Sequence, residues 1–455
     1  MRALSNMGFA LFGAALVAIS YGLARFAFGL FVPSISAELG LSANLVGIIG
    51  ALPFISFVMA SLVAPMAADR LGARNLAVLS SVAGAGGLGV ISQSADVYML
   101  GAGVFVCGVC TGFMMPALTA AMQALVSRSM HGRVSSILNA GTSVGVIVAV
   151  PTVVFLADAW RLTYSMFAVL AGLGAIAAWF FIPSVSRVIP SNAAPPAPIT
   201  RSQRSRLIRL SLFAFAMGFV SAAYWVFAPD LAVTLGALPA NQTGWLWFAV
   251  GLAGLGGAVV SDLADRNNPP ITQALMLMLL SSSLVLLAAS PDRLVLAMFS
   301  ALVFGLAYMS LSGLYLMTGI RLLPGRLSVG PVLPFVAIAL GQAVGSPVIG
   351  VLVESVGYAD AFSIFATIGI VTAIVSPAYP GHIDYWADWT ETETEETSAP
   401  WEEPEPEETG LQAAYDNQLV DEDGEPLDLD PDPVVEEEDS VAEETESESD
   451  KNDQR

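Results

Sequence analysis

The sequence predicts an all-α membrane protein with twelve transmembrane helices. Hydrophobic residues make up 55% of the 455-residue chain and charged residues only 13%, against about 25% in soluble domains. The mean hydropathy is +0.68. Apolar segments of about 20 residues recur along the chain, and this is the length that one helix needs to cross a bilayer. Because a backbone inside lipid has no water to bond, these segments are expected to be helical.

The apolar segments fall into two groups of six. The first group is expected at residues 8–32, 44–68, 75–93, 97–125, 134–156 and 162–183. The second group is expected at residues 208–230, 242–262, 271–290, 294–319, 330–352 and 359–379. The first segment has no small-residue cleavage site of the signal-peptide type, so we expect it to remain as a spanning helix.

The net charge of -21 belongs to the end of the chain. Residues 381–455 contain 29 of the 39 acidic residues and 2 of the 18 basic residues. A segment rich in Glu, Asp, Pro, Ser and Thr, with few branched apolar residues, cannot bury enough surface to fold. We therefore predict a disordered acidic tail over residues 381–455. The alternative is a tail that folds back on basic loops.

The loops between the predicted helices indicate the orientation of the chain. Alternate loops and the N-terminus carry thirteen arginines, whereas the opposite loops carry two. Lys and Arg are enriched on the cytoplasmic side of membrane proteins, and acidic residues contribute little to this rule. Both termini, including the acidic tail, are therefore expected in the cytoplasm.

The two groups of six form an internal repeat. A single shift of 196 residues aligns Phe31, Pro33, Asp69 and Arg70 with Phe227, Pro229, Asp265 and Arg266. Two parallel repeats of six helices are a transporter architecture, with the substrate site between the repeats near the midplane. The expected division is a first bundle (1–183), a proline-rich cytoplasmic linker (184–206), a second bundle (207–380) and the tail (381–455).

The loop between the second and third segments resembles the signature of the major facilitator superfamily, G-x-x-x-D-R/K-x-G-x-R/K. The sequence here reads Pro65-Met66-Ala67-Ala68-Asp69-Arg70-Leu71-Gly72-Ala73-Arg74. Pro65 replaces the leading glycine, and the second copy keeps only Asp265 and Arg266. The resemblance covers residues 1–380 and implies the superfamily fold and alternating access. The stretch from Tyr21 to Gly29 is similar to a bacterial branch, which implies a bacterial inner membrane.

The loop motif is the predicted gate. Asp69 lies at the inner end of the second segment, near the expected start of the eleventh, whose N-terminal dipole favours a carboxylate. Arg70 and Arg74 could bond the same carboxylate or loop carbonyls. The resemblance implies that this loop stabilises the outward-facing state, with the remaining gate positions at Gly72, Asp265 and Arg266. The alternative is that the arginines only anchor the topology.

Arg25 is the predicted substrate-binding charge. It lies eight residues before Pro33, the expected outer end of the first helix, and hence roughly 12 Å inside the membrane. Ionisable residues within membrane helices usually mark pathways, and a guanidinium matches carboxylate or phosphate oxygens as a fork. The alternative is a structural arginine that snorkels to the surface or has an internal partner.

Uncharged residues that could line the site are Tyr21, Thr111, Asn139, Thr142, Tyr224, Trp225, Trp245, Tyr308, Tyr315 and Gln342. Tyr21, Asn139 and Tyr224 are preferred, because Tyr21 shares a face with Arg25 and the others are polar groups on the fifth and seventh helices. Asp230 is a candidate ion-pair partner for Arg25, an outer gate or a proton site. The simpler interpretation makes the uncharged residues helix-packing groups and Asp230 a solvated helix-end carboxylate.

These features predict a secondary active or facilitative transporter that moves a small organic anion by alternating access. The alternatives are an efflux transporter for hydrophobic compounds and a non-transporting sensor that signals through its acidic tail. The fourth segment has no charge, and the resemblance implies that proton-driven drug exporters keep an arginine there.

No enzymatic activity is expected, because the chain has no Ser-His-Asp set and no phosphate-binding loop. Neither a cofactor nor a metal site is predicted. The expected partners are the small-molecule substrate, with or without a co-transported ion, and the lipid bilayer. We expect a monomer and no nucleic-acid partner.

Overall fold

The computed structural model describes residues 5–127, 130–184, 199–267, 269–323, 330 and 332–378. Most of the predicted linker and the whole predicted tail lie outside these residues. The side chains of residues 258–267, which include Asp265 and Arg266, also lie outside the description.

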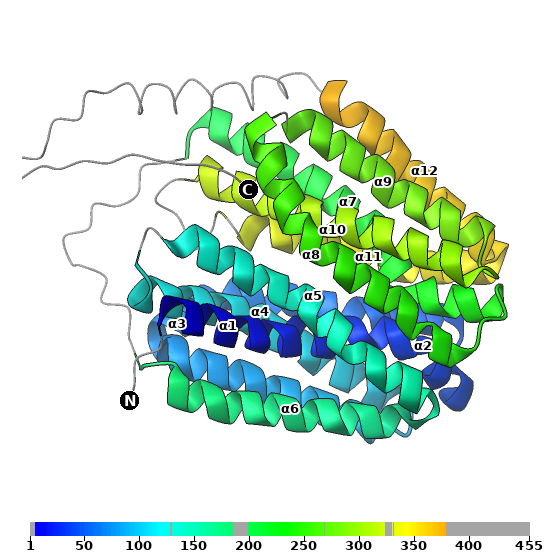
Figure 1. Ribbon diagram of the computed structural model, residues 1–455, viewed down its shortest axis with the longest axis horizontal. Coiled ribbons are helices and arrows are strands. Elements are labelled where there is room, and N and C mark those ends of the chain that lie inside the picture. Colours follow the sequence, from blue (N-terminus) through cyan, green and yellow to red (C-terminus); the bar gives the residue numbers. More distant parts are fainter. Residues whose placement is uncertain are drawn as a thin grey trace, which may run out of the picture. The chain divides into compact units, whose positions relative to one another are not determined.

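All regular structure in the described residues is helical (Figure 1). The first half of the chain forms α1 (Asn6–Val17), η1 (Ala18–Phe26), α2 (Ala27–Leu39), α3 (Ala43–Ser92), α4 (Val97–Leu125), α5 (His131–Leu156), η3 (Ala157–Ala159) and α6 (Trp160–Phe181). The second half forms α7 (Arg201–Thr234), η4 (Ala240–Gln242), α8 (Gly244–Asn267), α9 (Pro269–Ala289), α10 (Leu294–Leu322), α11 (Val332–Val356) and α12 (Tyr358–Ala378).

These helices provide the twelve predicted crossings. In the described residues, 10 helices are long and apolar enough to span a membrane. One of them, α3, has 50 residues and would be about 75 Å long, more than twice the thickness of a bilayer core. It breaks at Gly72, where φ is 77° and ψ is 163°, so it contains two crossings. The remaining crossing is α8, with 24 residues.

The first crossing is longer than predicted. It runs without interruption from Asn6 to Leu39, so Pro33 lies inside a helix and is not its end. Prolines are tolerated in membrane helices because neighbouring helices and local changes of helix type satisfy the freed carbonyls. The helix ends at Gly40, whose left-handed conformation (φ 62°) is a common helix stop. Arg25 therefore lies farther from the end of its helix than the prediction assumed.

Several helix starts follow from capping residues in the sequence. The side chain of Ser42 accepts a hydrogen bond from Leu45 at the start of α3, and the Asp96 carboxylate accepts one from Met99 at the start of α4. Such side chains satisfy backbone N–H groups that have no partner in the first helical turn. These caps fix the first residues of α3 and α4, each of which follows a short loop.

In each half, a glycine of the fifth helix allows that helix to pack closely against the first helix. A Cβ atom at Gly145 in α5 would collide with the backbone of Ala18, and one at Gly345 in α11 would collide with the backbone of Phe219 in α7. The fifth helix of each half therefore lies directly on the first helix of that half. Small residues permit this close backbone approach in membrane proteins.

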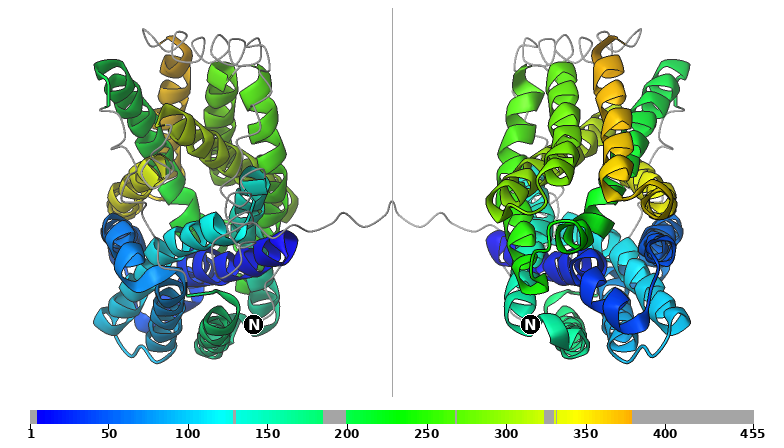
Figure 2. Two further views of the ribbon diagram at one scale, coloured as in Figure 1. Left: turned by 90° about the vertical axis from the view of Figure 1, so that its left-hand side faces the viewer. Right: turned by 90° about the vertical axis from the view of Figure 1, so that its right-hand side faces the viewer.

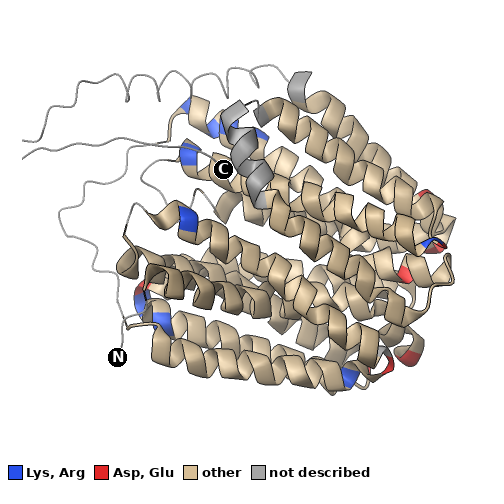
Figure 3. Cartoon of the chain, in the orientation of Figure 1, with Lys and Arg blue, Asp and Glu red and all other residues tan. Residues whose placement is uncertain are grey.

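The two halves lie against each other mainly along α2 with α7, α3 with α11, and α5 with α8. Figure 1 shows the helices of the second half above those of the first, and the end-on views of Figure 2 separate the same two groups. The charged residues lie near the two ends of the helices, and the long stretches between them are almost free of charge (Figure 3).

We define two ends by these charges. The basic end carries Arg70, Arg74, Arg133, Arg201, Arg204, Arg206, Arg209 and Arg321. The acidic end carries Glu38, Asp96, Asp158, Asp230, Asp292, Glu354 and Asp360, together with Arg161 and Arg293. Arg161 forms an ion pair with Glu38.

The halves interlock at the acidic end. The backbone N–H of Asn44 in α3 donates to Glu354 Oε1 in α11 at 2.9 Å. A Cβ atom at Gly47 would collide with the carbonyl of Ser346, and Gly350 in α11 comes equally close to α3. No side chain separates the two helices at these glycines, so the halves are tightly closed here.

Candidate functional site: an arginine between the two halves

Arg25 lies deep in the protein. Its side chain is 6% exposed, and it is the one charged residue that is buried within the described part of the chain. It belongs to η1, a π-helical segment of nine residues, and such segments are frequent at functional sites. Fourteen residues separate it from the end of the helix at Leu39, or about 21 Å along the axis. That distance is too long for the side chain to snorkel to the acidic end.

The guanidinium of Arg25 bonds across the interface between the halves. Arg25 Nη2 donates to Gln342 Oε1 in α11 at 3.1 Å. Gln342 Nε2 in turn donates to the Tyr308 hydroxyl in α10 at 3.3 Å. Arg25 Nε is buried and has no hydrogen-bond partner in the described residues. The hydrogen-bonded partner of this cation is therefore a neutral amide.

Four aromatic rings surround the guanidinium, and we call them the aromatic cage: Tyr21, Phe26, Phe54 and Phe57. The guanidinium carbon lies 4.6 Å from the ring centroid of Phe57, 4.7 Å from that of Phe54, 5.2 Å from that of Phe26 and 5.9 Å from that of Tyr21. Each desolvated cation–π contact contributes about 2 kcal/mol. The cage stabilises the positive charge of Arg25 but adds no negative charge to balance it.

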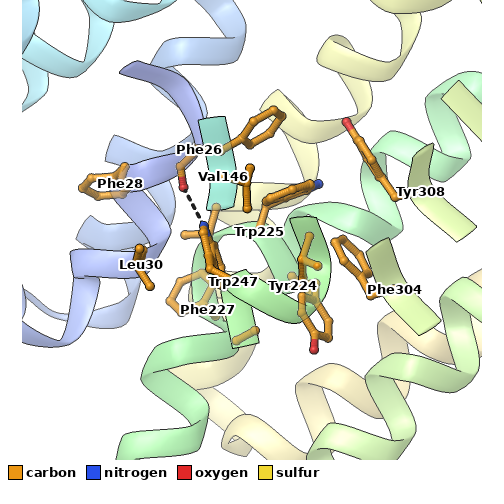
Figure 4. Close-up of a cluster of buried hydrophobic side chains, with 14 of the residues drawn as sticks. Phe26, Phe28, Leu30, Val146, Tyr224, Trp225, Phe227, Trp247, Phe304 and Tyr308 are labelled. Carbon is orange, nitrogen blue, oxygen red and sulfur yellow. Dashed lines mark hydrogen bonds between the residues drawn. The ribbon is translucent and has the colours of Figure 1, made fainter. Parts of the chain in front are cut away.

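The aromatic surface continues into the second half (Figure 4). Phe26 stacks on Trp225 of α7 with ring centroids 4.1 Å apart, and Trp225 meets the ring of Tyr308 edge-on at 5.2 Å. Trp247 of α8 donates its indole N–H to the carbonyl of Phe26 at 3.3 Å. Arg25 therefore lies where aromatic residues of both halves meet.

The structure brings some of the predicted site residues together and leaves others apart. Tyr21 joins Arg25 as part of the cage. Tyr224 is fully buried within the second half, where its hydroxyl bonds the Ser300 hydroxyl at 3.1 Å and its ring stacks on Phe304. In Figure 4 the Tyr224 hydroxyl points away from Trp225 and Tyr308. Asn139 is partly buried on α5 and has no hydrogen-bond partner among the described residues.

Asp230 does not pair with Arg25, contrary to one of the predicted roles. Its carboxylate accepts a hydrogen bond from the hydroxyl of Tyr358, the first residue of α12. This contact stays inside the second half and lies at the acidic end. Asp230 is partly exposed and lies four residues before the end of α7, so the interpretation as a solvated helix-end carboxylate stays open.

The predicted gate lies at the basic end, where its residues make no described contact with the other half. Asp69 and Arg70 are exposed, and neither forms a hydrogen bond or ion pair with any described residue. Gly72 produces the break in α3. Arg74 Nε donates to the Ile182 carbonyl at 2.7 Å, and its guanidinium lies over Trp179, so it bonds to its own half. The side chains of Asp265 and Arg266 lie outside the description.

Sequence reasoning missed Phe26, Phe54 and Phe57 as part of the site. Phe54 and Phe57 have the i, i+3 spacing of one helix face, but nothing in a single sequence shows that this face meets Arg25. Gln342 and Tyr308 were among the candidate lining residues, without any sign that one would bond Arg25. Their contacts join residues more than 30 positions apart.

Two six-helix halves with a polar and aromatic centre between them are the arrangement of a multi-pass membrane transporter. The family model of the Major Facilitator Superfamily matches residues 14–329, which is more than half of the chain. The protein therefore belongs to this superfamily. No curated protein matches the sequence at a significant level.

Solved transporter structures share the fold. The nucleoside transporter NupG is 13% identical, with a TM-score of 0.64 over 82% of this chain and 99% of its own. A transporter of the POT family in complex with a thioalcohol-conjugated peptide is 14% identical, with a TM-score of 0.67 over 81% and 94%. An inward-facing bacterial homologue of the lysosomal transporter Spinster is 13% identical, with a TM-score of 0.62 over 85% and 97%. Identities this low establish the fold alone.

Proposed function

We propose that the protein is a secondary active or facilitative transporter that moves a small organic anion by alternating access, and that Arg25 binds the anion. One observation carries the proposal. Arg25 is a buried cation at the interface of the two halves, and its hydrogen-bonded partner in the described residues is the neutral Gln342.

Electrostatics supports an anionic solute. Removing a charge from water costs several kcal/mol, and buried charges are normally paired. No acidic residue of the described part lies within ion-pair distance of Arg25. The cage and Gln342 recover part of this cost, and a bound anion would supply the missing opposite charge.

The position of Arg25 supports alternating access. Substrate sites of such repeats lie between the halves near the midplane, and Arg25 belongs to one half while its partner Gln342 belongs to the other. The positive-inside rule would place the basic end in the cytoplasm. The closed acidic end and the exposed Asp69 then correspond to a conformation that faces the cytoplasm.

The test is anion binding by variants of Arg25. Purified full-length protein in detergent is heated with acetate, lactate, benzoate, succinate or phosphate, and the shift in Tm is measured. We expect at least one anion to stabilise the wild type, Arg25→Lys to keep part of the shift and Arg25→Ala to lose it. Hydrogen bonds to charged groups are worth about 1.5–3 kcal/mol, so affinity should fall about tenfold or more.

Arg293→Ala is the matched control, because Arg293 is exposed at the acidic end. This variant should bind like the wild type. An Arg25→Ala protein that keeps full anion affinity would rule out Arg25 as the binding residue. Binding of uncharged hydrophobic compounds by Arg25→Ala and wild type alike would favour an efflux transporter.

A further inference from the structure

We infer that the transported anion carries a single negative charge on a carboxylate and has a flat, aromatic body. This inference rests on the proposed function and narrows it to one substrate class. Three features of the site carry it: the number of buried charges, the free donors of the guanidinium and the chemistry of the surrounding side chains.

The charge count favours a monoanion. Besides Arg25, the buried polar side chains of the described residues are serines, threonines and glutamines, all of them neutral. One negative charge on the ligand would be balanced by Arg25. A second would remain uncompensated among buried groups, which is strongly unfavourable.

The free donors of Arg25 favour a carboxylate. A guanidinium presents five N–H donors in a planar fork that fits the two oxygens of a carboxylate. Gln342 occupies Nη2 with one amide oxygen, and Nε has no partner among the described residues. A carboxylate on the Nε side of the fork would supply the acceptor that this donor has no partner for in the described residues. It can also displace the Gln342 oxygen, which is a neutral and weaker acceptor.

The walls of the site favour an aromatic body. The cage presents four rings around the guanidinium, and Phe26 extends this surface to Trp225 of the second half. Aromatic pairs gain about 0.5–1.5 kcal/mol beyond the burial of their area, which saturated groups do not gain. The polar groups that hydrogen bonds connect to Arg25 are Gln342 and, through it, the hydroxyl of Tyr308.

The experiment compares four small ligands that differ in one property each. Benzoate is the reference, cyclohexanecarboxylate removes aromaticity, phthalate adds a second charge and benzamide removes the charge. Affinities for purified full-length protein are measured by isothermal titration calorimetry. We expect benzoate to bind most tightly, cyclohexanecarboxylate about threefold to tenfold more weakly, and phthalate and benzamide at least about tenfold more weakly.

Phe57→Leu tests the cage itself, because leucine keeps an apolar side chain but removes the ring. It should weaken benzoate and leave cyclohexanecarboxylate almost unchanged. Phe365→Leu is the matched control, since Phe365 is also buried but stacks on Phe219 inside the second half. The four-ligand comparison on the wild type decides the question even if Phe57→Leu does not fold.

The outcomes separate this inference from the proposed function. Equal affinity for benzoate and cyclohexanecarboxylate would overturn the aromatic body, and tighter binding of phthalate would overturn the single charge. In both cases Arg25-dependent anion binding would stand. If no anion of either panel binds, or if binding does not depend on Arg25, the proposed function fails as well.

Discussion

The two ends of the helix bundle are built differently. At the acidic end α3 and α11 touch through glycines, and Glu354 of one half accepts the Asn44 N–H of the other. At the basic end Asp69 and Arg70 are exposed, while Arg74 bonds the carbonyl of Ile182 in its own half. The acidic end is closed mainly by close backbone packing, which does not depend on charge, and Glu354 adds one charged contact. The basic end presents charged side chains, whose contacts are more easily made and broken.

This comparison can be tested with distances between spin labels. Cysteines at Gln93 and Asp292, both exposed, report the separation of the halves at the acidic end. Cysteines at Gly132 and Ser202 report the basic end in the same way. The native Cys107 and Cys110 are buried and should not react with the label.

The largest effect is expected for Gly47→Leu. The new side chain would overlap the carbonyl of Ser346, so the acidic end could not close as it does in this structure. Overpacking of this kind costs about 1–3 kcal/mol, and the Gln93–Asp292 label distance should lengthen in most molecules. Gly86→Leu is the control on the same helix, because a Cβ at Gly86 meets only open space. An unchanged distance in Gly47→Leu would show that the acidic end is not closed by this contact.

A smaller effect is expected for Asp69→Asn. Because Asp69 has no described partner in this conformation, the substitution should leave the label distances and Tm of the resting protein unchanged. It should slow uptake of the best-binding anion into proteoliposomes by about tenfold, equivalent to about 1.4 kcal/mol in the barrier, if the basic end closes on this carboxylate. Asp360→Asn, an exposed acid at the acidic end, is the control. Normal uptake by Asp69→Asn would show that Asp69 is not part of a gate.

The smallest effect is expected for Glu354→Gln. The amide oxygen can still accept the Asn44 N–H, but the negative charge near the N-terminus of α3 is lost. Such charge–dipole interactions contribute about 0.3–1 kcal/mol and weaken with salt. The acidic-end label distance should therefore shift modestly at low salt and little at high salt, with Asp360→Asn as the control. A salt-independent shift would point to packing and not to charge.

The sequence was sufficient to predict the helical architecture, but it could not predict which residues contact Arg25. Hydropathy found every crossing, because each must bury about 20 apolar residues in lipid. Arg25 was found because a charge inside such a segment is rare. Gln342 could not be assigned to it, since the two meet only when the halves come together. The prediction that the first helix ends at Pro33 was wrong, since the helix continues to Leu39. Membrane helices accept prolines that would end a helix in water.

The π-helical segment η1 determines which face of the first membrane helix each neighbouring helix contacts. Before it, α1 lies on α5 of its own half, and after it α2 lies on α7 of the other half. A π-helical segment breaks the 3.6-residue repeat, so the two stretches can present different faces to different neighbours. Inserting or deleting one residue in η1 would turn everything beyond it by about 100°. Arg25 would then point away from Gln342, although the composition and length of the helix would barely change.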